Sequence, residues 1–200
     1  MNRVLEILQQ TGAVMTLGHF VGASGRHFDL YINKDALLPH TQAVSEIGKI
    51  FAEKYQNLDL DLVLGPALGG IFLSQWTAYH LSVLKGREIL SLYTEKTQDG
   101  QQIFTRGNEQ WIRGKKALIL EDCVTTGESV RKVINSVLRA EGQVAAVCVM
   151  VNKDPKNIHL DALAELPVVT YAAEDCPLCK DRIPINTTVG HGRKLCEIRR

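Results

Sequence analysis

The sequence lacks the long apolar run that a membrane-spanning helix requires. No apolar stretch approaches the roughly 20 residues needed to cross a bilayer. It also lacks a signal-peptide pattern, because charged residues interrupt the apolar N-terminal segment MNRVLEILQQ. We therefore expect a cytoplasmic protein that does not act on membranes.

Two further features are missing, an excess of one charge and a disulfide framework. The 23 Lys and Arg residues balance 22 Asp and Glu residues, which leaves a formal net charge of +1. This balance gives no global electrostatic argument for nucleic-acid or membrane binding. A small phosphate-bearing ligand, by contrast, needs only local positive charge. The five cysteines are odd in number and unevenly spread, so they do not indicate structural disulfides.

What remains is the composition of one globular domain, 200 residues long with 45% hydrophobic content, with room for a small appendage. Segments with strand character alternate with segments of helical spacing. This alternation predicts an α/β fold with a central parallel sheet flanked by helices, and with ligand loops at the carboxyl ends of its strands. Strands are expected at 58–64, 88–93, 117–122, 143–151 and 167–171, and helices at 1–12, 41–56, 71–84 and 130–138.

The stretch ALILEDCVTTGES, residues 117–129, carries the strongest chemical signal. An apolar strand ends in two carboxylates, Glu121 and Asp122, and a polar turn then leads into an amphipathic helix. The first amides of a helix lack intrahelical partners and carry partial positive charge, so such a turn can bind a phosphate. The carboxylates can hold ribose hydroxyls or, through water, Mg²⁺. An ordinary capped turn is the alternative. The expected phosphate-binding residues are Thr125, Thr126, Gly127, Glu128 and Ser129.

A second glycine-bearing turn, GPALGG at residues 65–70, also stands between a predicted strand and a predicted helix. Its glycines, Gly65, Gly69 and Gly70, allow the backbone to approach a ligand closely or to adopt a positive φ. The alternative is a tight turn that needs glycine only for packing.

Together these motifs resemble those of type I phosphoribosyltransferases. Two carboxylates followed by T-T-G-x-S resemble the motif that binds 5-phosphoribosyl-1-pyrophosphate (PRPP), and GPALGG resembles the pyrophosphate loop of orotate phosphoribosyltransferases. Residues 18–38 are similar to the base-binding region of the latter, which Gly18, Phe20, Ser24, Gly25 and Tyr31 match. The resemblance implies a single phosphoribosyltransferase domain over 1–200, with a PRPP-binding core at 41–151 and a hood region at about 1–40 and 152–200.

The resemblance implies a reaction in which a nitrogen of a nucleobase, orotate for preference, displaces pyrophosphate from Mg²⁺-bound PRPP. Glu121 and Asp122 would hold the ribose, and Mg²⁺ would be held through PRPP and water without direct protein ligands. A homodimer is also implied. The implied pyrophosphate-binding residues are Pro66, Ala67, Leu68, Gly69 and Gly70, and the implied base-binding residues are Phe20, Ser24, Gly25 and Tyr31.

The polar stretch 94–114 lacks a sustained period and occupies the position of the family's flexible catalytic loop. Lys96 and Arg106 are the candidates to close over pyrophosphate, although solvated loop charges are the usual fate of such residues. The stretch has fewer basic residues than the family commonly shows.

Three departures affect the expected base site, at Ala23, at Phe28 and at Asn152 with Lys153. Each removes a polar or guanidinium group that many family members carry. Two alternatives therefore stay open. The protein could act on another purine or pyrimidine base, or it could be a PRPP-binding regulatory protein with little turnover.

The tail contains Cys176-Pro-Leu-Cys179, which is half of a structural zinc site. His191 and Cys196 are scattered later candidates for further ligands. Reduced, partly buried thiols are the alternative.

Overall fold

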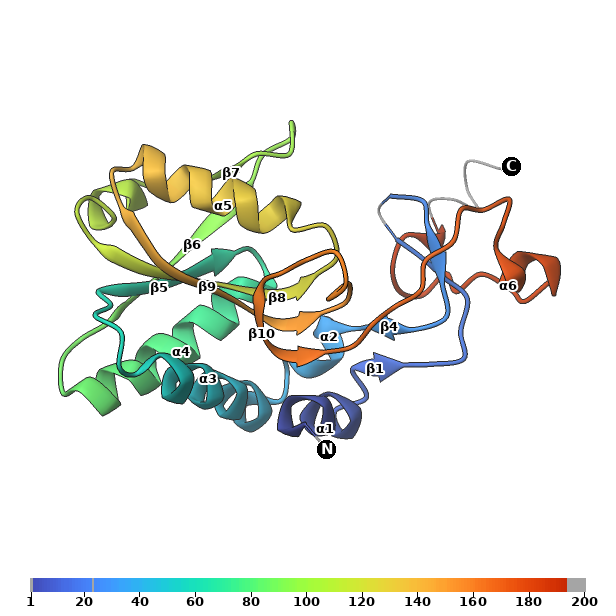
Figure 1. Ribbon diagram of the computed structural model, residues 1–200, viewed down its shortest axis with the longest axis horizontal. Coiled ribbons are helices and arrows are strands. Elements are labelled where there is room, and N and C mark those ends of the chain that lie inside the picture. Colours follow the sequence, from blue (N-terminus) through green and yellow to red (C-terminus); the bar gives the residue numbers. More distant parts are fainter. Residues whose placement is uncertain (1, 23, 194–200) are drawn as a thin grey trace. The chain divides into compact units, whose positions relative to one another are not determined.

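The computed structural model describes residues 2–22 and 24–193 (Figure 1). The chain divides into two compact units. The sheet unit comprises His40–Leu166, and the terminal unit combines Arg3–Pro39 with the chain from Pro167 onward.

A six-stranded sheet, in the order β10-β9-β8-β5-β6-β7, organises the sheet unit. All neighbouring pairs are parallel except β6 and β7, which are antiparallel. The parallel strands therefore end at one common edge, as the sequence predicted. Their bounds are β5 Leu62–Pro66, β6 Leu90–Lys96, β7 Gln102–Ile103, β8 Lys116–Val124, β9 Gln143–Asn152 and β10 Asp161–Glu165.

Helices cover both faces of this sheet (Figure 1). Helices α3 (Thr41–Tyr55) and α4 (Gly69–Lys85) pack together on one face, and α5 (Glu128–Arg139) lies on the other. A short 3₁₀ helix, η1 (Asn108–Trp111), precedes β8. Strands β5 and β8 are buried on both faces, which explains why they read as continuous apolar runs.

The buried face of α5 includes fewer residues than the apolar residues that recur at helical spacing in its sequence. Val130, Val133 and Val137 are buried, whereas Leu138 is 55% exposed. At ~100° per residue Leu138 stands about 80° from Val130 around the helix, at the margin of the buried stripe. Leu138 therefore continues the helical spacing of the apolar residues but lies outside the buried face.

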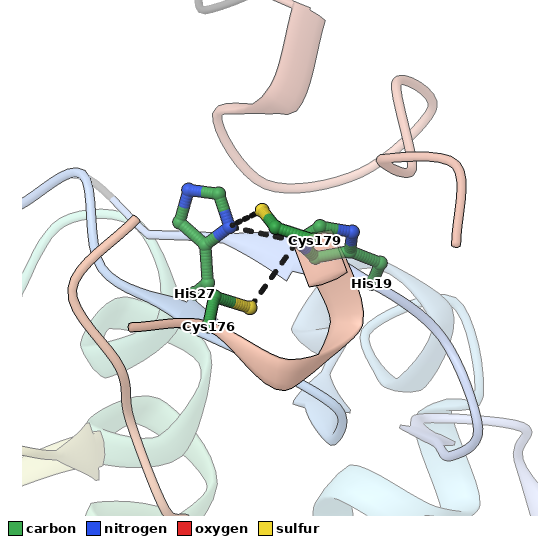
Figure 2. Close-up of side chains that lie close together, drawn as sticks. All are labelled: His19, His27, Cys176 and Cys179. Atoms are coloured by element: carbon green, nitrogen blue, oxygen red, sulfur yellow. Dashed lines mark hydrogen bonds between the residues drawn. The ribbon is translucent and has the colours of Figure 1, made fainter. Parts of the chain in front are cut away.

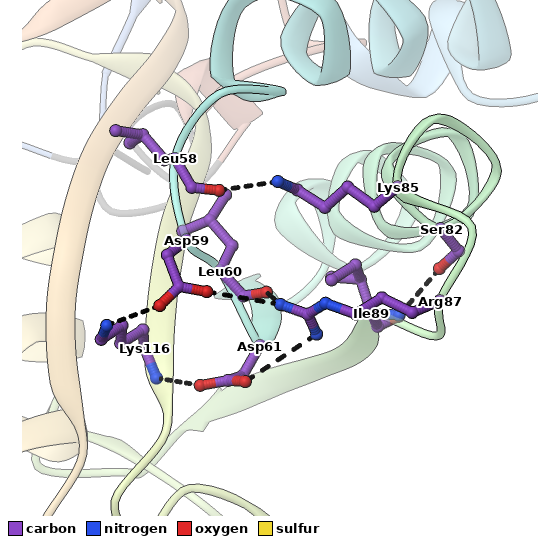
Figure 3. A network of polar contacts seen from close by, with 9 residues as sticks. All are labelled: Leu58, Asp59, Leu60, Asp61, Ser82, Lys85, Arg87, Ile89 and Lys116. Carbon is purple, nitrogen blue, oxygen red and sulfur yellow. Dashed lines mark hydrogen bonds and ion pairs between the residues drawn. The ribbon is translucent and has the colours of Figure 1, made fainter.

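Two strand predictions also need correction. The first strand begins at Leu62 instead of Leu58, because 58–61 carries two aspartates that bind the neighbouring elements instead of extending the ladder (Figure 3). The last strand is β10, not 167–171. Strand β10 pairs with β9 in parallel, whereas in 167–171 Pro167 has no N–H to donate.

The network before β5 fastens the start of the sheet (Figure 3). The Asp61 carboxylate accepts the backbone N–H of Lys116 at 2.9 Å, and the N–H of Asp61 donates to the Lys116 carbonyl at 2.9 Å. Asp59 forms an ion pair with the Lys116 ammonium at 2.6 Å. Arg87 lies 3.9 Å from Asp61 and donates to the Leu60 carbonyl at 2.6 Å.

The terminal unit consists of short elements. Helix α1 (Arg3–Gln10) buries Val4, Ile7 and Leu8. Strand β1 (Val14–Met15) pairs with β4 (Tyr31–Ile32), and β2 (Phe20–Val21) pairs with β3 (His27–Phe28), both antiparallel. Two single-turn helices, α2 (Lys34–Leu37) and α6 (Pro177–Lys180), complete the unit.

The β2–β3 hairpin has Gly25 in its turn at a φ of +76°, a conformation that favours glycine. The chain returning from the sheet unit joins this hairpin at Tyr171. The N–H of His27 donates to the Tyr171 carbonyl at 2.9 Å, and the N–H of Tyr171 donates back at 2.8 Å.

No helix among residues 2–22 and 24–193 combines the length and the apolar character needed to cross a membrane.

Candidate functional site

The turn between β8 and α5 forms a small concave site at the carboxyl edge of the sheet. Gly127, at the N-terminal boundary of α5, has a φ of +71°, which favours glycine over residues with a β-carbon. A pocket of about 170 Å³ lies over the turn, and it includes all five residues predicted to hold a phosphate. Its lining residues are Glu121, Cys123, Val124, Thr125, Thr126, Gly127, Glu128, Ser129 and Val130.

The two carboxylates have different surroundings. Glu121 is 8% exposed, and its Oε1 accepts the backbone N–H of Asp122 at 3.0 Å. Asp122 is half-buried, and its Oδ1 accepts the N–H of Cys123 at 2.5 Å. Glu121 lines the pocket over the turn, whereas Asp122 is half-buried against Gly69, so the two carboxylates face different parts of this edge.

The glycine loop after β5 packs directly against Asp122 and the backbone of β8. A β-carbon on Gly69 would lie 2.1 Å from Oδ2 of Asp122, and one on Gly65 would lie 2.5 Å from the Leu120 carbonyl oxygen. One on Gly70 would lie 2.8 Å from the carbonyl carbon of Gly65. None of these glycines has a positive φ, so their smallness serves close packing. The positive-φ explanation was wrong, and the packing explanation accounts for all three.

This loop is also tied to β6. The N–H of Ala67 donates to the Thr94 carbonyl at 2.8 Å, and a cis peptide bond joins Ala67 to Leu68. Leu68 itself is 61% exposed. The predicted pyrophosphate-binding residues 66–70 therefore join the end of β5 to the start of α4, beside β6 at Ala67 and beside Asp122 at Gly69.

Lys96 is the last residue of β6 and is exposed. The region 94–114, predicted as irregular, is partly regular, since β6 continues to Lys96 and pairs there with β7. The pKa of the Glu128 carboxyl is lowered, first by a hydrogen bond from Lys132 and then by the charges of Lys132, Arg131 and Lys96. The Lys96 side chain lies beside the β6–β7 turn, since a β-carbon on Gly100 would lie 3.8 Å from its Cε.

Lys132 is a residue that sequence reasoning missed. Its ammonium lies 2.6 Å from the Glu128 carboxylate and donates to the Gly100 carbonyl at 2.8 Å. It therefore connects the β6–β7 turn to the first turn of α5. The i,i+4 spacing from Glu128 was the available signal. Cys123, which lines the pocket, was also not singled out.

Arg106, by contrast, is paired within its own hairpin. Its Nε lies 3.6 Å from Oε1 of Glu95, and its side chain is 76% exposed. The Thr105 hydroxyl donates to the same Glu95 oxygen at 2.9 Å. Arg106 also has a positive φ of 60°.

The polar groups of Asn152 are committed to the turn after β9. The side chain is 1% exposed, its Nδ2 donates to the Ile158 carbonyl at 2.7 Å, and its Oδ1 accepts the Asp154 N–H at 3.0 Å. The hydrogen bonds of Asn152 within this turn therefore explain why an asparagine stands here, and no contact with a nucleobase is needed to explain it.

In the terminal unit, the predicted base-binding residues occupy the β2–β3 hairpin and β4. Phe20 is 1% exposed and stacks on Tyr31 with ring centroids 5.4 Å apart. Ser24 and Gly25 are exposed in the hairpin turn, and Ala23 lies outside the described residues. Phe28 stacks on Tyr31 at 6.3 Å, so it extends an aromatic cluster. Ser24 and Gly25 are the more accessible members of the predicted set.

Comparison with known proteins agrees with this geometry. The model of the phosphoribosyl transferase domain family matches residues 33–165. The chain is 33% identical over 187 residues to an orotate phosphoribosyltransferase of Caldanaerobacter subterraneus, covering 92% of this chain and 94% of that protein. It is 34% identical over 196 residues to an orotate phosphoribosyltransferase of Thermotoga petrophila, covering 96% of this chain and 100% of that protein.

A solved structure shows the same fold. The crystal structure of orotate phosphoribosyltransferase from Aeropyrum pernix matches with a TM-score of 0.63 at 24% identity, over 82% of this chain and 93% of that chain. The sheet carries a carboxylate pair and the predicted phosphate-binding turn at the carboxyl edge of its parallel strands, and the relatives match nearly the whole chain. The chain therefore belongs to the phosphoribosyltransferase family and has the type I phosphoribosyltransferase fold.

Proposed function

We propose that this protein is an orotate phosphoribosyltransferase, which converts orotate and PRPP to the nucleotide 5′-monophosphate and pyrophosphate in pyrimidine synthesis. The observation that carries the proposal is the contact between Gly69 and Asp122. This contact brings the glycine loop and the carboxylate motif together at one edge of the sheet, beside the pocket over residues 125–129. The choice of orotate is supported by the curated relatives, whose similarity extends over more than 90% of each chain.

In this proposal the turn 125–129 binds the 5′-phosphate of PRPP. Its residues other than Glu128 line the pocket and offer hydroxyl groups or backbone amides to a phosphate. The start of α5 adds partial positive charge. Glu128 is a carboxylate in the same turn, but Lys132 pairs with it at 2.6 Å and offsets its charge. The ion pair with Lys132 therefore reduces the repulsion that Glu128 would exert on a phosphate bound in this turn.

Asp122 and Glu121 would hold the ribose hydroxyls and stabilise the positive charge that develops at the anomeric carbon as the bond to pyrophosphate breaks. Asp122 is the more accessible of the two. The protein would mainly position the reactants, because the base nitrogen supplies the attacking electron pair and pyrophosphate leaves with the bonding pair.

The pyrophosphate would lie against residues 66–70, with Lys96 closing over it and excluding water. Carboxylate oxygens are the ligands that suit Mg²⁺, and the half-buried Asp122 beside the glycine loop fits a water-mediated contact with such an ion. When bound, Mg²⁺ neutralises the charge of the leaving pyrophosphate. Arg106 would contribute less than Lys96 to binding the pyrophosphate, because its ion pair with Glu95 must first break.

A cytoplasmic homodimer is part of the same proposal. Helix α4 exposes four large apolar or aromatic side chains, a set that suits contact with a second copy. They are Phe72, Tyr79, Val83 and Leu84. Sedimentation equilibrium of the purified chain would test this, and a monomer at working concentrations would contradict it.

The deciding experiment measures pyrophosphate release from PRPP and Mg²⁺ with orotate, and then with a panel of purine and pyrimidine bases. Release with orotate supports the proposal. Release with a different base instead would keep the PRPP site and move the substrate. No release with any base, together with PRPP binding in calorimetry, would favour the regulatory alternative.

A further inference from the structure

A second cluster of reactive side chains lies in the terminal unit (Figure 2). Two histidines from the β2–β3 hairpin and two cysteines from α6 and its N-terminal boundary point toward one another. Each offers one ligand atom, and these atoms all lie within 4.8 Å of one another. The four residues, here called the His/Cys cluster, are His19, His27, Cys176 and Cys179.

The distances within the His/Cys cluster are close to those of a tetrahedral metal site. The Cys176 Sγ and the Cys179 Sγ each lie 3.8 Å from Nε2 of His19, and the Cys179 Sγ lies 3.4 Å from Nδ1 of His27. Zn–N bonds of ~2.0 Å and Zn–S bonds of ~2.3 Å place the ligand atoms of a tetrahedral site about 3.3–3.8 Å apart. The two histidine nitrogens lie 2.7 Å apart, closer than two ligands of one ion, so they must separate when the ion binds.

A backbone carbonyl orients the first histidine for metal binding. Nδ1 of His19 lies 2.7 Å from the Ile183 carbonyl oxygen, which can only accept, so this nitrogen carries the proton. In the neutral ring Nε2 then presents a lone pair, and it faces the two sulfurs and His27. A histidine that donates from one nitrogen to a carbonyl and ligates through the other is the usual arrangement around zinc.

The local structure explains how these side chains meet. His19 immediately precedes β2 and His27 begins the partner strand β3, so the hairpin brings the two rings together. Cys176 is at the N-terminal boundary of α6, with Pro177 as its first residue, and Cys179 lies within that turn. A C-x-x-C pair on one turn directs both sulfurs to the same side, as in structural zinc sites.

Burial argues for a closed site. His19 is 2% exposed, and His27 and Cys176 are 0% exposed. Cys179 is half-buried. No disulfide occurs among the four cysteines that the structure describes, so neither Cys176 nor Cys179 is committed to a disulfide bond. With four protein ligands no position is left for a substrate, which is the mark of a structural site and not of a catalytic one.

We propose that the His/Cys cluster binds one structural Zn²⁺ ion, which fastens the C-terminal tail to the β2–β3 hairpin. The tail contributes short regular elements to this unit, among them α6 and the bridge between Tyr171 and His27, and a bound ion would add a tie to the hairpin. The ion would join residues 157 positions apart in the sequence, His19 and Cys176. Small units with little core commonly gain stability from a metal in this way.

The proposal completes the half site expected from the sequence. The partners of Cys176 and Cys179 are His19 and His27, far upstream, and not the later candidates. His191 is exposed, and its backbone N–H donates to the Val21 carbonyl at 2.9 Å. Cys196 lies outside the described residues.

The first test is elemental analysis of the unaltered full-length protein, purified without a metal-binding tag. We expect one zinc per chain, resistant to dialysis against weak chelators. Replacing zinc with Co²⁺ should give the intense visible d–d bands of a tetrahedral ion and the near-ultraviolet thiolate charge-transfer band. Protein that neither contains zinc nor takes up Zn²⁺ or Co²⁺ would overturn the proposal.

The second test uses variants. Cys176→Ser and His27→Gln should each reduce bound zinc to a trace. His159→Gln, an exposed histidine of the sheet unit, and Cys148→Ala, a buried thiol of β9, should retain one zinc per chain. Cys179→His keeps a ligand at that position and should retain Co²⁺ with a weaker charge-transfer band, whereas Cys179→Ser should lose it.

Retention of zinc by the Cys176→Ser and His27→Gln variants would overturn the assignment of ligands. If either variant fails to fold, the metal content and Co²⁺ spectrum of the unaltered protein still decide the question. None of these measurements uses PRPP or a base, so their outcome is independent of the proposed transferase activity.

Discussion

The carboxylate of Asp122 occupies the space that a β-carbon on Gly69 would need. Such an atom would lie 2.1 Å from Oδ2 and 2.9 Å from Cγ of Asp122. Two motifs that are well separated in the sequence are therefore interlocked at the carboxyl edge of the sheet. Any side chain at position 69 must displace either the loop or the carboxylate, and each displacement disturbs the proposed PRPP site.

Gly69→Ala should therefore impair the activity more than the fold. We expect kcat/KM for PRPP to fall by about 100-fold, since small misplacements of positioning groups are costly, with a modest change in Tm. Steady-state kinetics and thermal unfolding measure the two effects. Gly86→Ala is the contrasting control, because Gly86 ends α4 with a φ of +61° and open space around it. It should lose about 1 kcal/mol of stability and keep its KM for PRPP. Equal kinetic losses in both variants would contradict this account.

Lys96→Ala should separate turnover from binding. The ammonium is exposed at the end of β6, so its removal should leave the fold intact. If it stabilises the leaving pyrophosphate, kcat should fall by about 100-fold or more, while calorimetric binding of PRPP weakens only a few-fold. Lys115→Ala removes a comparable exposed ammonium just before β8 and should leave both values unchanged. A normal kcat in Lys96→Ala would refute the proposed role of Lys96.

Lys132→Gln should reveal the ion pair with Glu128 through its pH dependence. Lys132 is the main cause that lowers the pKa of Glu128 below its ordinary 4.5 in the folded chain. A carboxyl with a depressed pKa adds stability that is fully present above the unfolded value and is lost as the pH falls through the folded value. The variant should therefore be less stable than the unaltered chain at pH 7, and the difference should shrink only below about pH 4.5. Urea unfolding from pH 7 to pH 4 measures this. Arg131→Gln, which removes a lesser cause, should show a smaller difference.

The two aspartates before β5 should differ in their contribution to stability (Figure 3). Asp61 accepts a backbone N–H at the start of β8, so Asp61→Ala leaves that group without its partner and should cost about 1–2 kcal/mol. Asp59 is 72% exposed and forms only ion pairs, so Asp59→Ala should change the urea midpoint little. If both variants lose the same free energy of unfolding, the ion pairs of the aspartates, and not the backbone hydrogen bond to Asp61, stabilise the start of β8.

Local patterns were sufficient to predict the secondary structure around the candidate site. The strand, turn and helix at 116–139 follow from an apolar run, small polar residues and helical spacing that are all contiguous in the sequence. Strand β10 was missed because DALAE at 161–165 is short and mixed, and it pairs on one side only, at the edge of the sheet. Pairing with β9 stabilises such a strand, and its own residues carry no clear strand pattern.

The His/Cys cluster could not be assembled from the sequence for a related reason. The C-x-x-C pair is a local signal, whereas its two histidines stand 157 and 152 positions away from the cysteines that they contact. Neither histidine has a local pattern that marks it as a ligand. The glycine loop shows the same limit, since the demand for Gly69 comes from Asp122 on another strand.

Removal of the metal should expose two specific thiols. In the zinc-bound protein Cys176 and Cys179 should resist alkylation by iodoacetamide at pH 8, because bound thiolates are poor nucleophiles in a closed site. A strong chelator should make both reactive. Cys148 reports on global unfolding, because burial raises the pKa of its thiol to about 12 and keeps it inert while the fold persists. Mass spectrometry of peptides after alkylation distinguishes these sites. Labelling of Cys176 and Cys179 without Cys148 would show that the metal orders the tail locally. Simultaneous labelling of Cys148 would show that the ion supports the whole fold, and equal labelling with and without chelator would argue against a metal at the cluster.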